Sequence, residues 1–207
     1  MNRTLIGGFV AVAVLTSMGG VARASKTVIK TKGMDAAGSF ESQQTQKCAD
    51  GTTAMSTTSV QIDMFESVTT TNGSAVNVLQ TSLSVSRFDG CNFVFSFGSG
   101  LFQGVGALSM TALDKATIVG NFTLDDGTRL NVNLTVTGSD TTSLGINSRR
   151  SILGKVMTLQ RSSGLSRTAT LSGTVKVDGQ IFGAAQMTTS NGNLARNTGG
   201  EITIVKP

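Results

Sequence analysis

Carboxylates are the side chains in this sequence with the clearest potential for chemistry. Four of them lie in two short stretches and would suit a hydrolase that uses paired acids: Asp35, Glu41, Asp63 and Glu66. The 207-residue chain contains no histidine, which excludes Ser-His-Asp and Cys-His catalytic sets. It also lacks Trp and Tyr, the aromatic platforms on which glycosidases usually hold sugars. We therefore expect the carboxylates to be solvated strand and turn residues, and the protein not to be an enzyme.

The two cysteines, Cys48 and Cys91, predict a disulfide. They are even in number and form no Cys-x-x-Cys motif, and the chain begins like an exported one. A metal pair or a catalytic thiol would be expected to have histidine partners, and the sequence has none. We expect no metal site and no cofactor.

Residues 1–24 have the parts of a secretory signal peptide. Arg3 gives a positive start, residues 5–15 form an apolar run too short to span a bilayer, and Ala22 and Ala24 frame a cleavage site. No later stretch is apolar enough for a transmembrane helix, and an outer-membrane barrel would need aromatic girdles. The sequence predicts a secreted or periplasmic protein that does not span a membrane.

Basic residues gather in one part of the chain. From Thr141 to Val177 there are six of them and no acidic residue, which predicts a contact for an anionic glycan or lipid surface. A turn at 162–164 would bring two of the arginines together. The alternative is a basic solvated face that only aids solubility. No aromatic residue interleaves the arginines, so sequence-specific nucleic-acid binding is not expected. The candidate binding residues are Arg149, Arg150, Arg161 and Arg167.

The apolar residues alternate with polar ones at the period of a β-strand. Runs over 116–124, 129–136 and 168–177 show this best, and Asx-Gly pairs such as Asp126-Gly127 and Asp178-Gly179 suit tight hairpin turns between strands. The fold class predicted is all-β, an antiparallel up-and-down meander closed as a β-barrel, with a two-sheet β-sandwich as the alternative. A loose N-terminal segment over 25–37 is expected to precede a single β domain over 38–207.

Two breaks in the alternation lead to further expectations. The apolar positions change parity between Val78 and Leu79, which predicts a β-bulge. Residues 140–150 show little alternation and are expected to form the longest connection. Six apolar residues are expected to fill the interior or to line a cavity: Phe93, Phe95, Phe97, Leu130, Val132 and Leu134.

Three functions remain open from the sequence. The first is a non-catalytic binding or interaction module of the cell envelope or secretome, in contact with anionic glycan or lipid. The second is a calycin-like barrel that carries a small apolar ligand. The third is a subunit of an extracellular fibre, in which an N-terminal segment adds to the sheet edge of a neighbour. The oligomeric state is left open.

Overall fold

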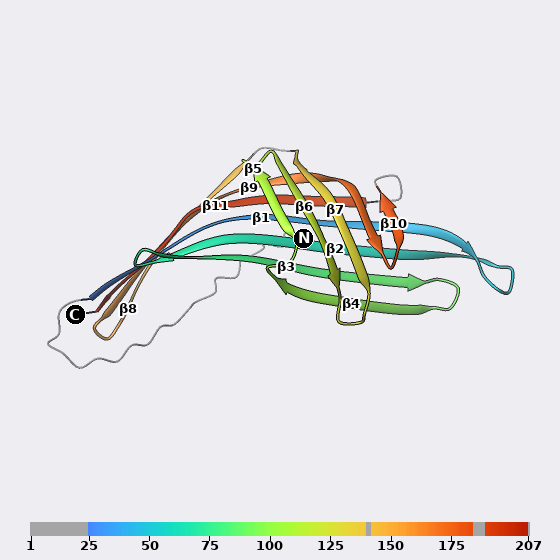
Figure 1. Cartoon of the computed structure of the whole chain (residues 1–207), viewed down its shortest axis with the longest axis horizontal. Helices are drawn as coiled ribbons and strands as arrows, with labels where there is room; N and C mark the ends of the chain where they lie inside the picture. Colours follow the sequence, from blue (N-terminus) through green and yellow to red (C-terminus); the bar gives the residue numbers. More distant parts are fainter. Residues whose placement is uncertain (1–24, 140–141, 184–188, 207) are drawn as a thin grey trace.

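The structure, a computed structural model, describes residues 25–139, 142–183 and 189–206. The expected signal peptide, residues 1–24, lies outside the described residues. Within the described ranges the chain forms strands and turns, which confirms the all-β class (Figure 1). No helix in these ranges is long and apolar enough to cross a membrane.

Eleven strands follow one another along the chain. They are β1 (Ser25–Lys47), β2 (Thr53–Thr71), β3 (Ser74–Asp89), β4 (Val94–Gln103), β5 (Ala107–Thr111), β6 (Lys115–Thr123), β7 (Arg129–Gly138), β8 (Ser143–Leu153), β9 (Val156–Val177), β10 (Gln180–Gly183) and β11 (Thr189–Lys206).

The strands form one antiparallel meander whose ends approach each other. The sheet order is β4-β3-β2-β1-β11-β9-β7-β6-β5, so the last strand, β11, lies between β1 and β9. The path opens between β4 and β5, which do not pair in the described part of the chain. There the β6–β7 turn contacts β4: Asp125 donates its backbone N–H to the carbonyl of Ser99 at 2.9 Å and accepts the Ser99 N–H at 2.8 Å. The antiparallel meander is thus confirmed, but its closure as a β-barrel is not, because the ring of strands is uneven and opens between β4 and β5.

The core lies on one face of this curled sheet and forms a single cluster. β6 and β7 contribute alternate residues to it, as the alternation predicts, whereas no described residue of β8 belongs to it. Ile118, Leu134 and Val136 are fully buried, and Leu130 and Val132 are nearly so. The expectation for the three phenylalanines is wrong, because the side chains of Phe93, Phe95 and Phe97 are 83%, 65% and 57% exposed.

Several of the predicted turns are present. Asn72-Gly73 and Asp178-Gly179 both have positive φ at each residue, as a type I′ turn requires, and they join β2 to β3 and β9 to β10. The predicted disulfide is confirmed as well. Cys48 and Cys91 lie 5.4 Å apart between Cα atoms and tie the β1–β2 loop to the β3–β4 loop.

Three local expectations differ from the structure. Residues 25–37, expected to be loose, belong to β1, which pairs with β2 and β11 on its two sides. No bulge lies at Val78 and Leu79, because β2 and β3 pair in continuous register; the parity changes where β3 leaves the core and Val78 faces outward. Register shifts occur instead at Thr31/Gly33 and Asn197/Gly199. Most of 140–150 is not a connection but the strand β8.

Candidate functional site

The four candidate arginines lie on β8 and β9. Arg149 and Arg150 are on β8, and Arg161 and Arg167 are on β9. The expected turn at 162–164 is absent, since β9 runs straight through these residues and pairs with both β8 and β11. Arg161 and Arg167 are therefore six residues apart along one strand, and no hairpin brings them together.

Strand register decides which of these arginines are neighbours. Arg150 lies opposite Leu159 and Ser148 lies opposite Arg161, so Arg150 and Arg161 are diagonal neighbours on one face. Arg149 points to the other face, because successive side chains of a strand alternate. Arg167 is engaged elsewhere: its Nη1 lies 2.6 Å from Oδ1 of Asp114 in the β5–β6 turn.

The β8–β9 hairpin that carries these residues is an edge of the sheet. Its loop is the two residues Gly154 and Lys155, and the left-handed φ of Gly154 is the conformation that a type II′ turn needs at its first position. In the described residues β8 pairs with β9 alone. Figure 1 shows the hairpin at one end of the molecule, beside the start of β1 and the end of β11.

Exposed aliphatic side chains share this hairpin with the cations. Every described residue of β8 is exposed, and the aliphatic ones are uncovered to an unusual degree: Leu144 63%, Ile146 74%, Ile152 62% and Leu153 85%. Ile152 and Leu153 lie at the tip, next to the Gly154 turn. Ile152 and Leu153 are adjacent at the tip and point to opposite faces of the strand, and exposed apolar side chains grouped in this way are a common mark of an interaction site.

The charge at this end of the molecule is one-sided. The neighbouring ends of β1, β8, β9 and β11 carry seven cationic side chains and one carboxylate, Glu201, which lies opposite Arg161. Unlike Arg167, the cations nearer the tip are exposed and form no ion pair with the described residues; these are Arg149, Arg150, Lys155 and Arg161. The seven cations are Lys26, Lys30, Arg149, Arg150, Lys155, Arg161 and Lys206.

The structure also joins two of the four carboxylates singled out in the sequence. Asp35 on β1 and Asp63 on β2 are diagonal neighbours, because Ala37 pairs with Asp63 and Asp35 pairs with Phe65. Burial first, and then the charge of Asp63 and a hydrogen bond with it, raise the pKa of Asp35 to about 7. Burial also raises the pKa of Asp63, whereas its hydrogen bond with Asp35 lowers it.

This pair is arranged to share a proton. Burial raises the pKa of both carboxyls and a hydrogen bond joins them, so the pair holds a proton at a higher pH than isolated carboxyls would. Carboxyls in direct hydrogen-bond contact are closer than the roughly 5 Å or more that separates the two acids of a glycosidase. Glu41 and Glu66 are not part of the pair: Glu41 lies opposite Ser59, and Glu66 lies opposite Met34 on the other face.

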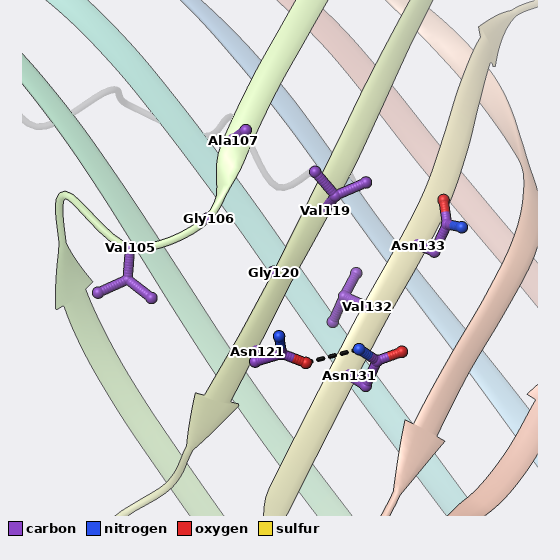
Figure 2. Close-up of a pocket in the computed structure, with 9 residues that line it drawn as sticks. All are labelled: Val105, Gly106, Ala107, Val119, Gly120, Asn121, Asn131, Val132 and Asn133. Atoms are coloured by element: carbon purple, nitrogen blue, oxygen red, sulfur yellow. Dashed lines mark hydrogen bonds between the residues drawn. The ribbon is translucent and has the colours of Figure 1, made fainter.

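A shallow hollow lies on the outer side of β5, β6 and β7. It measures about 590 Å³, is open to solvent, and is lined by Val119, asparagines and two glycines among others. In Figure 2 the side chains of Asn121 and Asn131 meet across β6 and β7, and Nδ2 of Asn131 donates to Oδ1 of Asn121 at 2.5 Å. No charged side chain lines this hollow. It offers amide groups for hydrogen bonding but no acid, base or nucleophile.

Sequence reasoning missed the aliphatic residues of the hairpin. The signal was present, because Leu144, Ile146 and Ile152 occupy alternate positions and Gly154-Lys155 is a suitable turn. Ser148 and Arg150 break the alternation at the two remaining positions, and this obscured the strand.

Comparison with known proteins adds little to this geometry. No protein family matches the chain, and no curated protein matches it in sequence. Among solved structures, it is similar to a Nitrosomonas europaea protein provisionally named AttH, at 9% identity and a TM-score of 0.35. The match covers 84% of this chain and 51% of the other, so the chain spans about half the length of that protein.

Proposed function

We propose that the protein is exported and binds anionic lipid surfaces through the tip of the β8–β9 hairpin, without catalysis. The observation that carries this proposal is the exposure of Ile152 and Leu153 at the tip of a strand pair that also carries Arg149, Arg150 and Lys155. Apolar side chains with flanking cations suit the boundary between the acyl chains and the anionic headgroups of a membrane.

The register indicates that the hairpin meets the surface tip first. Arg149 and Arg150 point to opposite faces and lie about 13 Å and about 10 Å from the turn, at a strand rise of about 3.3 Å per residue. When the tip enters by 5 to 10 Å, as interfacial segments do, both guanidinium groups reach the phosphate level. Lys155 at the turn has a long stem that lets its ammonium return to the headgroups.

Neither kind of contact is sufficient alone. Each cation near an anionic leaflet contributes about 1 kcal/mol, and it does so only within a Debye length. Burial of an exposed Ile or Leu contributes about 1.5 to 3 kcal/mol. Three cations and two tip side chains together give about 6 to 9 kcal/mol before the cost of association, which corresponds to weak, reversible binding that is sensitive to salt.

The apolar tip favours lipid over acidic glycan. A glycan would gain from the arginines but not from Ile152 and Leu153, which would remain uncovered. The calycin-like alternative is less favoured because Leu130, Val132 and Leu134 pack into the core cluster and the three phenylalanines lie outside it.

The absence of Trp and Tyr allows a direct test. A Leu153→Trp variant of residues 25–207 has one fluorophore and no background. We expect its emission to shift to the blue with vesicles of phosphatidylcholine and phosphatidylglycerol at low salt, and the shift to disappear with phosphatidylcholine alone or at 0.5 M salt. In co-sedimentation, Arg149→Gln/Arg150→Gln should weaken binding about 30-fold, from about 1 kcal/mol per lost cation.

The matched control is Lys115→Gln/Lys176→Gln, which removes the same charge from exposed positions outside the hairpin and should leave binding nearly unchanged. Ile152→Ser/Leu153→Ser should weaken vesicle binding at least as much as loss of the arginines. The protein could instead be retained on an acidic polysaccharide, equally well with and without Ile152 and Leu153, and fail to bind vesicles. That result would mean that the ligand is a glycan and not a lipid.

A further inference from the structure

The edge strand β4 and the turn before it carry a row of exposed aromatic side chains, with Phe93 in the turn and the others on the strand. Phe93, Phe95 and Phe97 point away from the core, as does Leu101, which is 63% exposed. In Figure 1, β4 is the outermost strand of the β1–β4 sheet. This row lies on a different strand from the hairpin and plays no part in the proposed lipid contact.

The backbone of this edge is open over a short stretch. The N–H and carbonyl of Ser99 point away from β3, because both bond to Asp125. In an antiparallel strand the direction of these groups alternates, so those of Phe97 and Phe95 point the same way. Within the described part of the chain nothing pairs with them. The β6–β7 turn thus covers the edge at Ser99, and the edge is open at Phe95 and Phe97.

The open stretch is held in place from both sides. The Cys48–Cys91 disulfide anchors the loop that precedes β4, and Asp89 accepts the backbone N–H of Cys91 at 2.9 Å. The Phe93 ring packs edge-on against Phe88 of β3, with ring centroids 6.4 Å apart. A fixed edge with unpaired hydrogen-bond groups is a ready template for another strand.

We propose that this edge pairs with the same edge of a second copy, in an antiparallel β4–β4 contact centred on Ser96. The sequence Phe95-Ser96-Phe97 is a palindrome, so a two-fold axis at Ser96 places each Phe95 opposite the partner's Phe97. Those are the residues whose backbone groups point outward, so each such pair exchanges two hydrogen bonds. Ser96 of one copy then lies opposite Ser96 of the other, and these two residues form a pair without backbone hydrogen bonds between them. The interface is isologous and closes on itself, which gives a dimer and not a fibre.

The exposed area sets the expected strength. A buried aromatic side chain covers about 150 to 250 Å², so the three exposed rings offer about 400 Å² per copy at the exposures given above. With the backbone and Val94, the total for two copies is about 1,000 Å², near the lower limit for a specific interface. The dimer should therefore dissociate in the micromolar range.

Sedimentation velocity of residues 25–207 between 1 and 200 µM tests the association. We expect a monomer at the low end and a dimer at the high end. Phe95→Lys/Phe97→Lys places like charges opposite each other and should abolish the dimer. Val76→Lys is the matched control, since Val76 is a similarly exposed apolar residue on the same sheet face but not at this edge, and it should leave the dimer intact.

Cysteine cross-linking tests the register of the β4–β4 contact, and it does not require that the Phe95→Lys/Phe97→Lys variant folds. Ser96→Cys should form an intermolecular disulfide under mild oxidation, because side chains in this kind of pair have Cβ atoms about 4.5 to 5.5 Å apart. Val94→Cys is the control, because in this register Val94 faces the partner's Gly98 and lies far from its own copy. A monomer at 200 µM, or equal cross-linking of the two variants, overturns the proposal. If the chain is monomeric and the two lysines reduce vesicle binding, the row is a lipid contact and not a dimer interface.

Discussion

Replacement of Asp35 by asparagine should stabilise the protein at alkaline pH and leave its stability nearly unchanged at pH 4. The pKa of Asp35 is raised from 3.8 to about 7 in the folded state, by burial first and then by Asp63. In the unfolded chain it returns to about 3.9. Between these values the folded protein holds a proton that the unfolded chain has lost, so the free energy of unfolding falls as the pH rises from about 4 to about 7. Asparagine removes this loss and can still donate a hydrogen bond to Asp63.

The size of the gain follows from the shift. Three pKa units at 1.36 kcal/mol each would give about 4 kcal/mol for a fully dry site. Because both side chains are only partly shielded from solvent, we expect about half of this, or about 2 kcal/mol at pH 8. The difference between the variant and the parent should be small at pH 4, grow through pH 5 and 6, and level off above pH 7.

The assay is urea denaturation at pH 4, 5.5, 7 and 8 without reductant, followed by far-ultraviolet circular dichroism because the chain has no Trp. Asp178→Asn is the control, and it should lower the free energy of unfolding at neutral pH, where Asp35→Asn raises it. The backbone N–H of Arg129 and then the Arg87 side chain lower the pKa of Asp178, so its contribution is present at neutral pH and is lost as the pH falls below about 4. If Asp35→Asn is destabilised at pH 8, or if its difference from the parent does not change with pH, the two carboxyls do not share a proton.

Two further predictions concern the folded framework. Removal of the disulfide by Cys48→Ala/Cys91→Ala should lower the free energy of unfolding by about 4 kcal/mol in the chain-entropy model, measured from urea midpoints; a loss below about 1 kcal/mol would mean that the crosslink constrains little. Gly173→Ala should cost about 2 kcal/mol or more, because Gly173 has a φ of 109° and an added Cβ would meet the carbonyl oxygen of Asn133. Gly145→Ala, where nothing lies closer than 3.9 Å, is its control and should be neutral within about 1 kcal/mol; equal effects at the two glycines would contradict the structure.

The parts of the fold that could be predicted from the sequence are those that local patterns determine. Alternation over 116–124 and 129–136 identified β6 and β7 and their buried faces, because a strand's side-chain period is fixed by its backbone. Asn72-Gly73 and Asp178-Gly179 marked true turns, since few residue pairs adopt positive φ twice. Two cysteines allowed only one intramolecular pairing.

Long-range pairing could not be predicted in the same way. Residues 25–37 are rich in lysine and appeared loose, yet β11 lies along one side of them and β2 along the other. The Asp35–Asp63 pair required the register of the β1–β2 hairpin, which depends on the five-residue loop at 48–52. A one-residue slip of that register would have moved one of the two carboxyls to the opposite face.

The phenylalanines of β4 show why alternation predicts a face but not what covers it. Three aromatic residues at alternate positions indicated a buried row. The core side of β4 is instead formed by Gly98, Gly100 and Phe102. Cβ atoms at these glycines would collide with Asp126 and with the Phe102 ring, so the space that larger side chains would need is already filled. The row of phenylalanines must then face outward. Exposed there, it contributes little to the folding free energy of a single copy. An uncovered row beside an unpaired edge is better explained by association than by the stability of the monomer.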